Sequence, residues 1–446
     1  MLPRPRDSAG PTPLPHNRIN NPLSTLTLQD EIPQNESLPA NALCLIQDQL
    51  ALDVAPTRNH GTFVTTHMEP EAEQLMVETL RKNLINHESY PGTTKIEKLC
   101  INMIARLFHA PLQGSQDAVG TSTAGSSEAI LLATLAMKKR WAGKRKAAGK
   151  DYSRPNMIMS SAVQVCWKKT ACYFDIEERY VYCTEDRNTI DPHEAIDLVD
   201  ENTIGICSIL GTTYTGEYED TMAINDLLVE RNLDVPIHVD AASGGFVAPF
   251  LHPELVWDFR LEKVASINVS GHKYGLVYAG IGWAIWRDAE YLPKELIFHH
   301  HYLGSQQASF SLNFSRSASH VICQYYNLVR LGRHGYRRIM LQCARTAEYL
   351  ALNLKKLGCF EIISGNALSL PMVVFRLNDA KEYPVDEFAI AAELHRRGWT
   401  VPAYTLAPHN EITNILRVVV RADFSRWDCD ALVQALSDIL STFSSP

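Results

Sequence analysis

The sequence has no apolar run that approaches the roughly 20 residues needed to cross a bilayer, so we expect no membrane association. Its first residues, MLPRPRDSAGPTPLPHNRINNP, lack the apolar core of a secretory signal, and their prolines oppose the amphipathic helix of a mitochondrial transit peptide. The 10 cysteines, from Cys44 to Cys429, include no C-x-x-C pair, which argues against a zinc site and against a disulfide framework. These absences predict a reduced, cytoplasmic protein.

Positive charge is not in excess either. The chain carries 42 Lys and Arg against 50 Asp and Glu, for a net charge of -8. This balance argues against nucleic acid as a partner, although a local basic patch would escape the count. The 446 residues, of which 46% are hydrophobic, suffice for two or three globular domains.

The first part of the chain reads as an N-terminal arm, partly flexible, over residues 1–57, because its beginning is rich in Pro, Asn and Ser. From about residue 58, apolar strand candidates alternate with amphipathic helices. This alternation predicts a large α/β domain over 58–340, with a mainly parallel sheet covered on both faces. Polar or glycine-rich residues directly follow three strand candidates, at 204–210, 236–239 and 264–269. Ligands bind beyond the carboxyl ends of such strands.

The chain after about residue 340 has a different order of elements. We predict a helix, a strand, a helix, a strand and a final helix, at 339–356, 370–377, 386–397, 415–420 and 426–443. This order predicts a small α+β C-terminal domain over 341–446 that packs against the large one.

A candidate phosphate loop lies at 120–128, where GTSTAGSSE runs directly into a helical stretch. Small residues let backbone N–H groups approach an anion, and a helix N-terminus supplies free donors and a positive dipole end. The hydroxyls of Ser126 and Ser127 add donors. Taken alone, the segment fits a simple helix cap better, a serine with a glutamate nearby. It matches neither the Walker motif nor the dinucleotide fingerprint.

Three charged residues lie in or just after strand candidates. Asp240, in HVDAASGG, could reach a flat ligand or could cap the next turn. Lys273, in SGHKY, could form a Schiff base with a carbonyl, although a loop lysine is more often solvated. Arg417, inside the apolar strand ILRVVV, needs a partner for its charge. A substrate carboxylate or a structural Asp or Glu would serve equally well.

Each motif is weak alone, but the ordered set is strong. Pyridoxal phosphate requires a phosphate loop, a strand-end Asp, a strand-end Lys (here 33 residues later) and an Arg for the substrate carboxylate. The Lys forms the Schiff base, the Asp keeps the pyridine nitrogen protonated, and the ring serves as an electron sink.

Nine segments carry a resemblance to a known family: LINHESYPGT, AVGTSTAGSSEAILL, VQVCWKK, ENTIGI, TTYTGEYED, HVDAASGGFVAPF, SINVSGHKYGL, YLGSQQASFSLNFSR and ILRVVVR. At these residues the chain resembles the group II pyridoxal-phosphate decarboxylases, and among them the glutamate decarboxylases, from about residue 40 onward. The resemblance implies an aminotransferase-like (fold type I) architecture and pyridoxal 5'-phosphate as cofactor. It also implies α-decarboxylation of an acidic L-amino acid, with L-glutamate as the first candidate.

The resemblance implies specific cofactor contacts. Lys273 would carry the Schiff base, Asp240 would contact the pyridine nitrogen, and His272 would join them as a catalytic residue. The phosphate would be held by Ser126, Ser127, Ser270 and His272, with Ser315 reaching the phosphate of a neighbouring subunit. The ring would lie among Gln164 on one face, Ala242 beneath the other, and Thr213 close by.

It also implies substrate contacts. Arg417 would bind the α-carboxylate, and Thr62 and Phe63 match the position that holds the distal carboxylate. Asn83 and Asn86 would approach that carboxylate from the partner subunit. The protein would therefore be a homodimer or a multiple of dimers with shared sites. The Pro-rich arm differs from the helical N-terminus of bacterial hexamers, which favours a dimer.

Two departures from the family pattern leave the substrate open. Asn86 stands where bacterial glutamate decarboxylases carry Asp, and Ser305-Gln306 stands where the family has a small residue followed by Asp. Aspartate, a sulfinic analogue or an intermediate of a specialised pathway are alternative substrates. Transamination or oxidative decarboxylation on the same scaffold are alternative reactions. A scaffold that only binds partners is disfavoured, because Ser126, Asp240, Lys273 and Arg417 are all present.

Two further features predict absences. Consecutive residues of an extended segment point to opposite faces, so we expect no metal site at His299–His301. The sequence ends at SDILSTFSSP without an added tail, so we expect neither a tail-based shutdown at neutral pH nor calmodulin binding.

Overall fold

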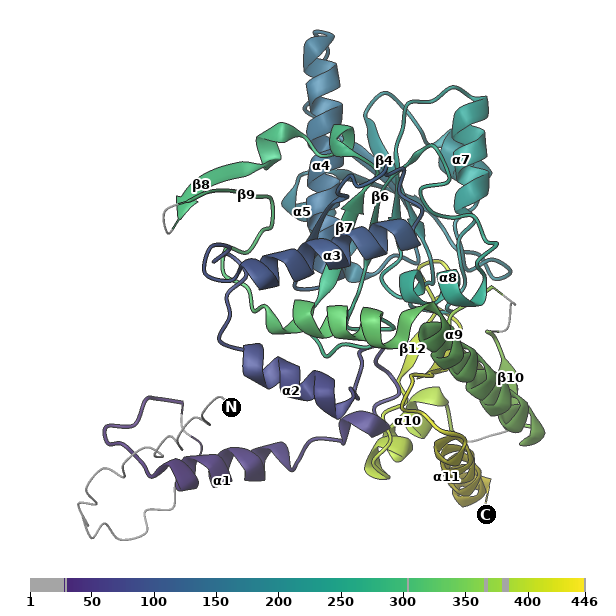
Figure 1. Cartoon of the computed structure of the whole chain (residues 1–446). Coiled ribbons are helices and arrows are strands. Elements are labelled where there is room, and N and C mark those ends of the chain that lie inside the picture. Colours follow the sequence, from purple (N-terminus) through teal and green to yellow (C-terminus); the bar gives the residue numbers. More distant parts are fainter. Residues whose placement is uncertain (1–27, 29, 303–304, 365–367, 379–384, 445–446) are drawn as a thin grey trace, which may run out of the picture. The chain divides into compact units, whose positions relative to one another are not determined.

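The computed structural model describes residues 28, 30–302, 305–364, 368–378 and 385–444, with the side chains of 299–308 also outside the description (Figure 1). The chain divides into two compact units, residues 1–54 and 55–446. The first unit contains helix α1 (Pro39–Leu50), which starts with the proline that suits a first helical turn. All α1 side chains are at least partly exposed, Leu43, Ile46 and Leu50 among them.

The second unit is built on a seven-stranded sheet with the order β1-β7-β6-β5-β4-β2-β3. Its strands are β1 (Val119–Thr123), β2 (Asn156–Ser160), β3 (Glu177–Val181), β4 (Thr203–Ile209), β5 (Ile237–Asp240), β6 (Val264–Val269) and β7 (Gly282–Trp286). All neighbours pair in parallel except β7, which runs against both β6 and β1. The mainly parallel sheet and the three strands predicted at its centre, β4, β5 and β6, are confirmed.

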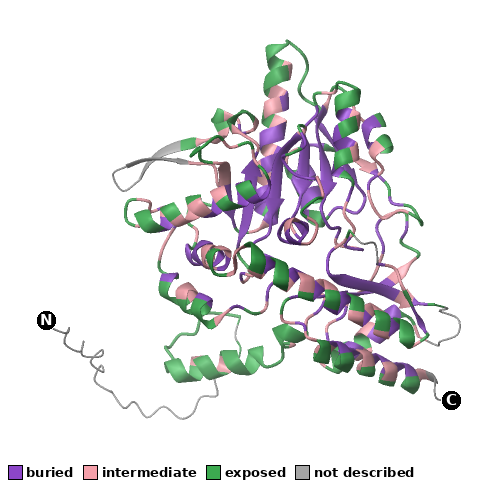
Figure 2. Cartoon of the chain, turned by 45° about the vertical axis from the view of Figure 1, so that its right-hand side comes forward, coloured by how far each residue is buried: buried purple, intermediate pink, exposed green. Residues whose placement is uncertain are grey.

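The central strands are buried along their whole length, because helices cover both faces of the sheet (Figure 2). This is why β4 and β6 read as nearly continuous apolar runs. The helices of this region are α2 (Pro70–Thr79), α3 (Pro91–Leu107), α4 (Ser126–Ala147), α5 (Val165–Tyr173), α6 (Pro192–Asp197), α7 (Thr221–Glu230) and α8 (Ala248–Leu251). A hairpin of β8 (Phe298–Tyr302) and β9 (Ser305–Ser309) follows. The predictions for the side chains of His299–His301, Ser305 and Gln306 fall outside the described residues.

A long helix, α9 (Ser319–Lys356), leads into the C-terminal region. It is broken at Gly332, whose φ of +56° suits glycine because that residue has no Cβ. The predicted helix at 339–356 is its second half, and the predicted domain boundary at residue 340 falls inside α9.

A four-stranded antiparallel sheet with the order β10-β11-β13-β12 lies in this region. Its strands are β10 (Phe360–Ile362), β11 (Met372–Leu377), β12 (Ala403–Thr405) and β13 (Asn414–Val419). Helix α9 packs on β10 and β11, α10 (Glu387–Arg396) packs on β12 and β13, and α11 (Arg426–Ser444) packs on both helices. The predicted β11, β13, α10 and α11 are confirmed. No helix in the described part of the chain is long and apolar enough to cross a membrane.

Candidate active site

A cavity of about 450 Å³ opens where β4, β5 and β6 end and α4 begins. This is the position expected for a ligand on a mainly parallel sheet. Nine of the residues predicted to bind the cofactor line it: Ser126, Ser127, Gln164, Thr213, Asp240, Ala242, Ser270, His272 and Lys273. The tenth, Ser315, does not line it.

One end of this cavity is suited to an anion. Helix α4 begins after Gly125 without a side-chain cap, so the predicted alternative of a simple serine cap does not describe it. The Oγ atoms of Ser126 and Ser270 lie 2.7 Å apart. Nδ1 of His272 is buried without a hydrogen-bond partner, and a Cβ at Gly125 would lie 2.9 Å from Cε1 of His272. Burial lowers the pKa of His272 to about 4, so its ring is neutral at neutral pH.

Asp240, 6% exposed, receives three hydrogen bonds at the end of β5. Oδ2 accepts from Nε1 of Trp167 at 2.8 Å, and Oδ1 accepts from Nδ2 of Asn268 at 2.9 Å. The backbone N–H of Ala242 also donates to Oδ1, at 3.1 Å. Asp240 therefore caps the next turn and also faces the cavity, and its contact with a flat ligand stays a prediction.

A second layer of polar groups fixes Asn268. The ring of His238 lies between Asn268 and Ser266, with Nε2 2.7 Å from Oδ1 of Asn268 and Nδ1 2.7 Å from Oγ of Ser266. Burial lowers the pKa of His238, which favours a neutral ring. Because Asn268 uses its N–H on Asp240, its Oδ1 accepts from His238, and the hydroxyl of Ser266 then donates to Nδ1.

Lys273 extends into the cavity and is largely buried, unlike the solvated loop lysine of the alternative. Its Nζ donates to Oγ of Ser243 at 3.1 Å and lies 5.3 Å from the centroid of the Phe63 ring. It forms no ion pair with any carboxylate in the described part of the chain. Burial lowers the pKa of Lys273, the nearby Asp240 and Cys166 oppose that shift, and Arg417 adds a smaller lowering effect. A buried amine with a lowered pKa is suited to nucleophilic chemistry on a carbonyl.

Arg417 lies on β13 and is 7% exposed. Its Nη1 and Nη2 donate to the backbone oxygens of Thr213 and Gly61, at 2.5 and 2.6 Å, whereas Nε is buried without a partner. The guanidinium lies 5.0 Å from the ring centroid of Phe63. Within the residues described, no Asp or Glu pairs with it. The structural carboxylate considered as an alternative partner is therefore not observed, and donors remain free for a ligand.

The other predicted substrate contacts fall into two groups. Phe63 is buried beneath both Lys273 and Arg417, next to Thr62, whose Oγ1 accepts from the N–H of Val64. Asn83 donates to Oγ of Ser315 at 3.0 Å, and Oδ1 of Asn86 is buried without a partner. None of the predicted substrate contacts lines the cavity itself. Phe63 and Arg417 lie next to it through Lys273 and Thr213, whereas Asn83 bonds Ser315.

Several residues of the site were missed by the sequence interpretation. Trp167 lies in the segment VQVCWKK, but the sequence interpretation assigned it no role. His238 and Asn268 were also missed, although the register gives a clue: His238 pairs with Ser266, and Asp240 pairs with Asn268. Polar residues at alternate positions of two buried neighbouring strands point to one buried polar network. Ser243, Cys166 and Asn313 complete the wall of the cavity.

No group of three or more His, Cys, Asp or Glu side chains that could hold a metal ion occurs among the described residues. The site instead combines a hydroxyl- and imidazole-lined anion end, a fixed carboxylate and a buried lysine. These groups fit a phosphorylated aromatic aldehyde.

Comparisons with known proteins agree with this chemistry. Residues 35–378 match the model of the pyridoxal-dependent decarboxylase conserved domain. The chain is 50% identical to a Petunia hybrida glutamate decarboxylase over 414 residues, 92% of this chain and 82% of that protein. It is 46% identical to glutamate decarboxylase beta of Listeria innocua over 391 residues, 86% of this chain and 84% of the other.

Solved structures are also similar. A Lactobacillus brevis glutamate decarboxylase superposes with a TM-score of 0.90 at 42% identity, covering 94% of this chain and 96% of the other. A Burkholderia pseudomallei sphingosine-1-phosphate lyase shares the fold, with a TM-score of 0.78 at 21% identity and 93% of both chains covered. The aminotransferase-like α/β architecture predicted from the sequence is confirmed. The chain belongs to the pyridoxal-dependent decarboxylase family.

Proposed function

We propose that this protein is a pyridoxal 5'-phosphate-dependent carboxy-lyase that converts L-glutamate to 4-aminobutyrate and carbon dioxide. The observation that carries the proposal is the position of Lys273, a buried amine without a carboxylate partner at the cavity that also holds Asp240. The sequence identities of 50% and 46% to two glutamate decarboxylases, over most of the chain, support L-glutamate as substrate.

The cavity fits the cofactor at both ends. Ser126, Ser127, Ser270 and the unpartnered Nδ1 of His272 would hold the phosphate, where Gly125 leaves room that a Cβ would fill. When bound, the cofactor supplies a carbonyl for Lys273 and a ring that accepts electrons from the bond that breaks. Gln164 and Ala242 would lie on opposite faces of that ring, and Thr213 beside it.

Asp240 would keep a proton on the pyridine nitrogen. Its carboxylate is held by Trp167, Asn268 and the N–H of Ala242, so it need not reorganise when charge develops. Lys273 is the group placed to return a proton to Cα after carbon dioxide leaves, because the neutral ring of the adjacent His272 has a single N–H, which would serve the phosphate. The lowered pKa of Lys273 makes its amine available in the neutral form for attack.

Arg417 would orient the substrate. Its unpaired Nε and the second hydrogens of Nη1 and Nη2 can donate to the α-carboxylate in the forked geometry that guanidinium groups favour. With Thr62 and Phe63 at the distal carboxylate, the bond to the α-carboxylate can be held in the orientation that breaks it in preference to other bonds at Cα.

We further propose that two subunits share their sites. Phe63 contacts Lys273 and Arg417 of its own chain, whereas Asn83 bonds Ser315 and neither of these two lines the cavity, as expected if they act in that of a partner. In this proposal a cytoplasmic homodimer is the working unit. The large domain (58–340) holds the cofactor, and the small domain (341–446) supplies Arg417.

Product analysis on a panel of amino acids tests the proposed function. Purified protein with added pyridoxal 5'-phosphate is incubated with L-glutamate, L-aspartate or cysteine sulfinate, and amines, keto acids and aldehydes are quantified. We expect 4-aminobutyrate from L-glutamate as the main product. Turnover of another amino acid in place of L-glutamate would indicate that Asn86 changes the substrate preference. A keto acid or aldehyde as product would indicate another reaction on the same scaffold.

A further inference from the structure

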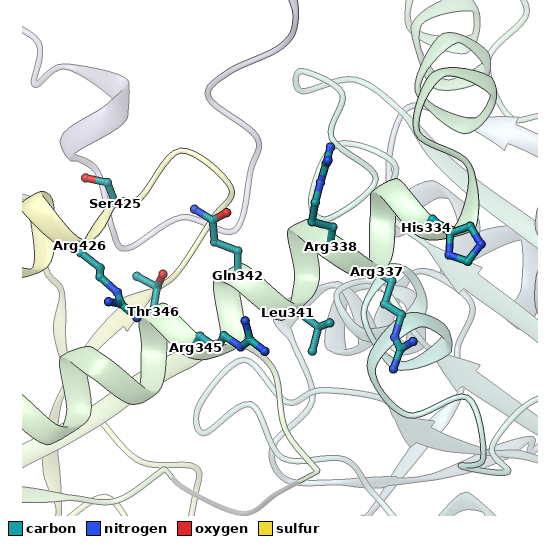
Figure 3. Close-up of a pocket in the computed structure, with 9 residues that line it drawn as sticks. All are labelled: His334, Arg337, Arg338, Leu341, Gln342, Arg345, Thr346, Ser425 and Arg426. Atoms are coloured by element: carbon teal, nitrogen blue, oxygen red, sulfur yellow. The ribbon is translucent and has the colours of Figure 1, made fainter.

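A second cavity, of about 520 Å³, lies along the second half of α9 and the start of α11 and shares no residue with the active site (Figure 3). Four arginines and a histidine dominate its wall: His334, Arg337, Arg338, Arg345 and Arg426. Leu341 contributes an apolar surface and the largely buried Thr346 a hydroxyl. A cavity of this size lies within the range of small-molecule sites, about 300–1,000 Å³.

The four arginines have no counter-charge of their own. Among the described residues none of them forms an ion pair, whereas the nearby Arg330 pairs with Glu69 and Arg421 with Asp423. The chain as a whole is acidic, with a net charge of -8, so this concentration of unpaired positive charge is local. The four guanidinium groups carry the same charge, and a bound anion would neutralise it.

The acidic residues at the start of α11 are engaged elsewhere. Asp428 accepts from the N–H and the hydroxyl of Ser425, at 2.9 and 2.6 Å. Asp430 accepts from the hydroxyl of Tyr349 at 2.7 Å, and the ring of Tyr349 lies 5.1 Å from the guanidinium of Arg426. These contacts fix the helix start and leave Arg426 facing the cavity.

The spacing of the arginines indicates how large an anion must be to contact several of them at once. Arg337 and Arg345 are eight residues apart on one helix, which places their Cα atoms about 12 Å apart. Figure 3 shows Arg337 and Arg338 leaving α9 in different directions, while Arg426 reaches in from α11. A single orthophosphate cannot contact charges spread so widely, whereas a chain of linked phosphates can.

We propose that this cavity binds a small polyanion of linked phosphate groups, either a nucleoside triphosphate or an inorganic polyphosphate. Guanidinium groups suit such a ligand, because each presents several N–H donors in a plane and can bind phosphate oxygens in pairs. None of its residues belongs to the active site, so binding can be measured with the cofactor site filled.

Isothermal titration of the cofactor-loaded protein with inorganic tripolyphosphate, at constant ionic strength, tests the proposal. We expect saturable binding of one molecule per chain and at least tenfold weaker binding to the double variant Arg345→Gln/Arg426→Gln. Gln preserves helix propensity, so the fold should persist. The matched control is Arg333→Gln, an exposed arginine of α9 outside the cavity, which should change affinity less than twofold. Tighter binding of a nucleoside triphosphate would identify a nucleotide site, and equal binding would identify a polyphosphate site.

Five outcomes would overturn the proposal. Binding could fail to saturate, or Arg333→Gln could weaken it as much as the double variant, which would indicate a diffuse electrostatic field. Equal binding of citrate would show that the site does not select phosphate. Bleaching of the visible cofactor absorbance on titration would place the anion at the cofactor site. A change in oligomeric state of the double variant without added anion, seen by sedimentation, would make this surface a subunit contact.

Discussion

Asn268 donates its side-chain N–H to Oδ1 of Asp240 across 2.9 Å, and the two residues face each other in the register of β5 and β6. Behind Asn268, the ring of His238 bridges to Ser266. Asp240 is therefore the end of a buried chain of hydrogen bonds in which every member has a partner. Such a network fixes the position of a carboxylate better than solvent can.

Replacing Asn268 by Ala should lower kcat/KM for decarboxylation. The change removes one of the two donors to Oδ1 of Asp240, which keeps the N–H of Ala242, and leaves a ring N–H of His238 without a partner. That loss costs about 1–3 kcal/mol, or about 5- to 150-fold in kcat/KM if it falls on the transition state. Ser266→Ala is the matched control, since it removes only the outer bond to His238 and should have a smaller effect. A larger effect of Ser266→Ala than of Asn268→Ala would contradict the positioning role.

Trp167→Phe should lower kcat by about tenfold and leave KM nearly unchanged, because it removes one hydrogen bond to a charged acceptor. The remaining ring can still pack near His238, whose centroid lies 5.4 Å from that of the Trp167 ring. Trp257→Phe shortens another buried tryptophan, one that packs on Phe108, and should reduce thermal stability without changing kcat. Equal kcat values for the two variants would show that the indole N–H of Trp167 has no effect on catalysis.

Arg417→Met should raise KM for L-glutamate by at least about thirtyfold, since a buried charge-assisted pair is worth about 2–5 kcal/mol. The product, 4-aminobutyrate, has no α-carboxylate and should inhibit the variant as well as the wild type. Inhibition constants for the product therefore separate loss of a substrate contact from general damage to the loops at Thr213 and Gly61. If product and substrate binding weaken together, Arg417 serves the fold and not the α-carboxylate.

Stability at acidic pH should depend on His60. Its buried ring packs against Trp399 and Phe424, at centroid distances of 5.5 and 4.2 Å, and burial lowers its pKa to about 4. The unfolded chain takes up a proton at this residue near pH 6.5, before the folded chain does. The neutral His60 ring therefore contributes fully to the free energy of unfolding above pH 6.5. This contribution is lost as the pH falls from 6.5 to about 4, and the total loss is about 3 kcal/mol.

His60→Phe should flatten this pH dependence. Urea midpoints measured from pH 7 to pH 4.5 should fall less steeply in the variant than in the wild type. His193→Gln, at an exposed position of α6, serves as control and should keep the wild-type slope. An unchanged slope in His60→Phe would assign the acid sensitivity to other groups.

Sharing of sites between subunits should appear as complementation. Lys273→Ala removes the lysine of its own cavity, and Ser315→Leu disturbs the surface offered to the partner, where Ser315 bonds Asn83. Co-expression of the two inactive variants should restore about one quarter of wild-type activity, because half of the dimers are mixed and each has one intact site. Additive activities of the two separate variants would indicate that each chain builds its own site.

Strands could be predicted from the sequence where they are buried on both faces and therefore consist of an uninterrupted apolar run. IGICSIL, VASINV and ILRVVV identify β4, β6 and β13 because strands covered on both faces need such runs. The short β10 and β12 carry too few residues to show a period, and nothing local reveals that β7 runs against its neighbours. Strand direction is set by how the chain returns to the sheet, which is a tertiary property.

The site could be predicted only at the ends of strands. Asp240 and Lys273 were found because each charge directly follows an apolar run. Trp167 was missed because it is 73 residues from the carboxylate that it bonds, and Asn268 because it is an amide inside a buried strand. The arginine-lined cavity was invisible to a charge count of the whole chain, since two helices far apart in sequence form it.

Release of carbon dioxide from carbon 1 of L-glutamate, with 4-aminobutyrate measured in the same reaction, tests the central claim most directly when wild type and Lys273→Ala are compared. We predict equal amounts of the two products from the wild type and a rate at least about a thousandfold lower from Lys273→Ala. Turnover by Lys273→Ala at the wild-type rate, or no 4-aminobutyrate from the cofactor-loaded wild type, would contradict the account.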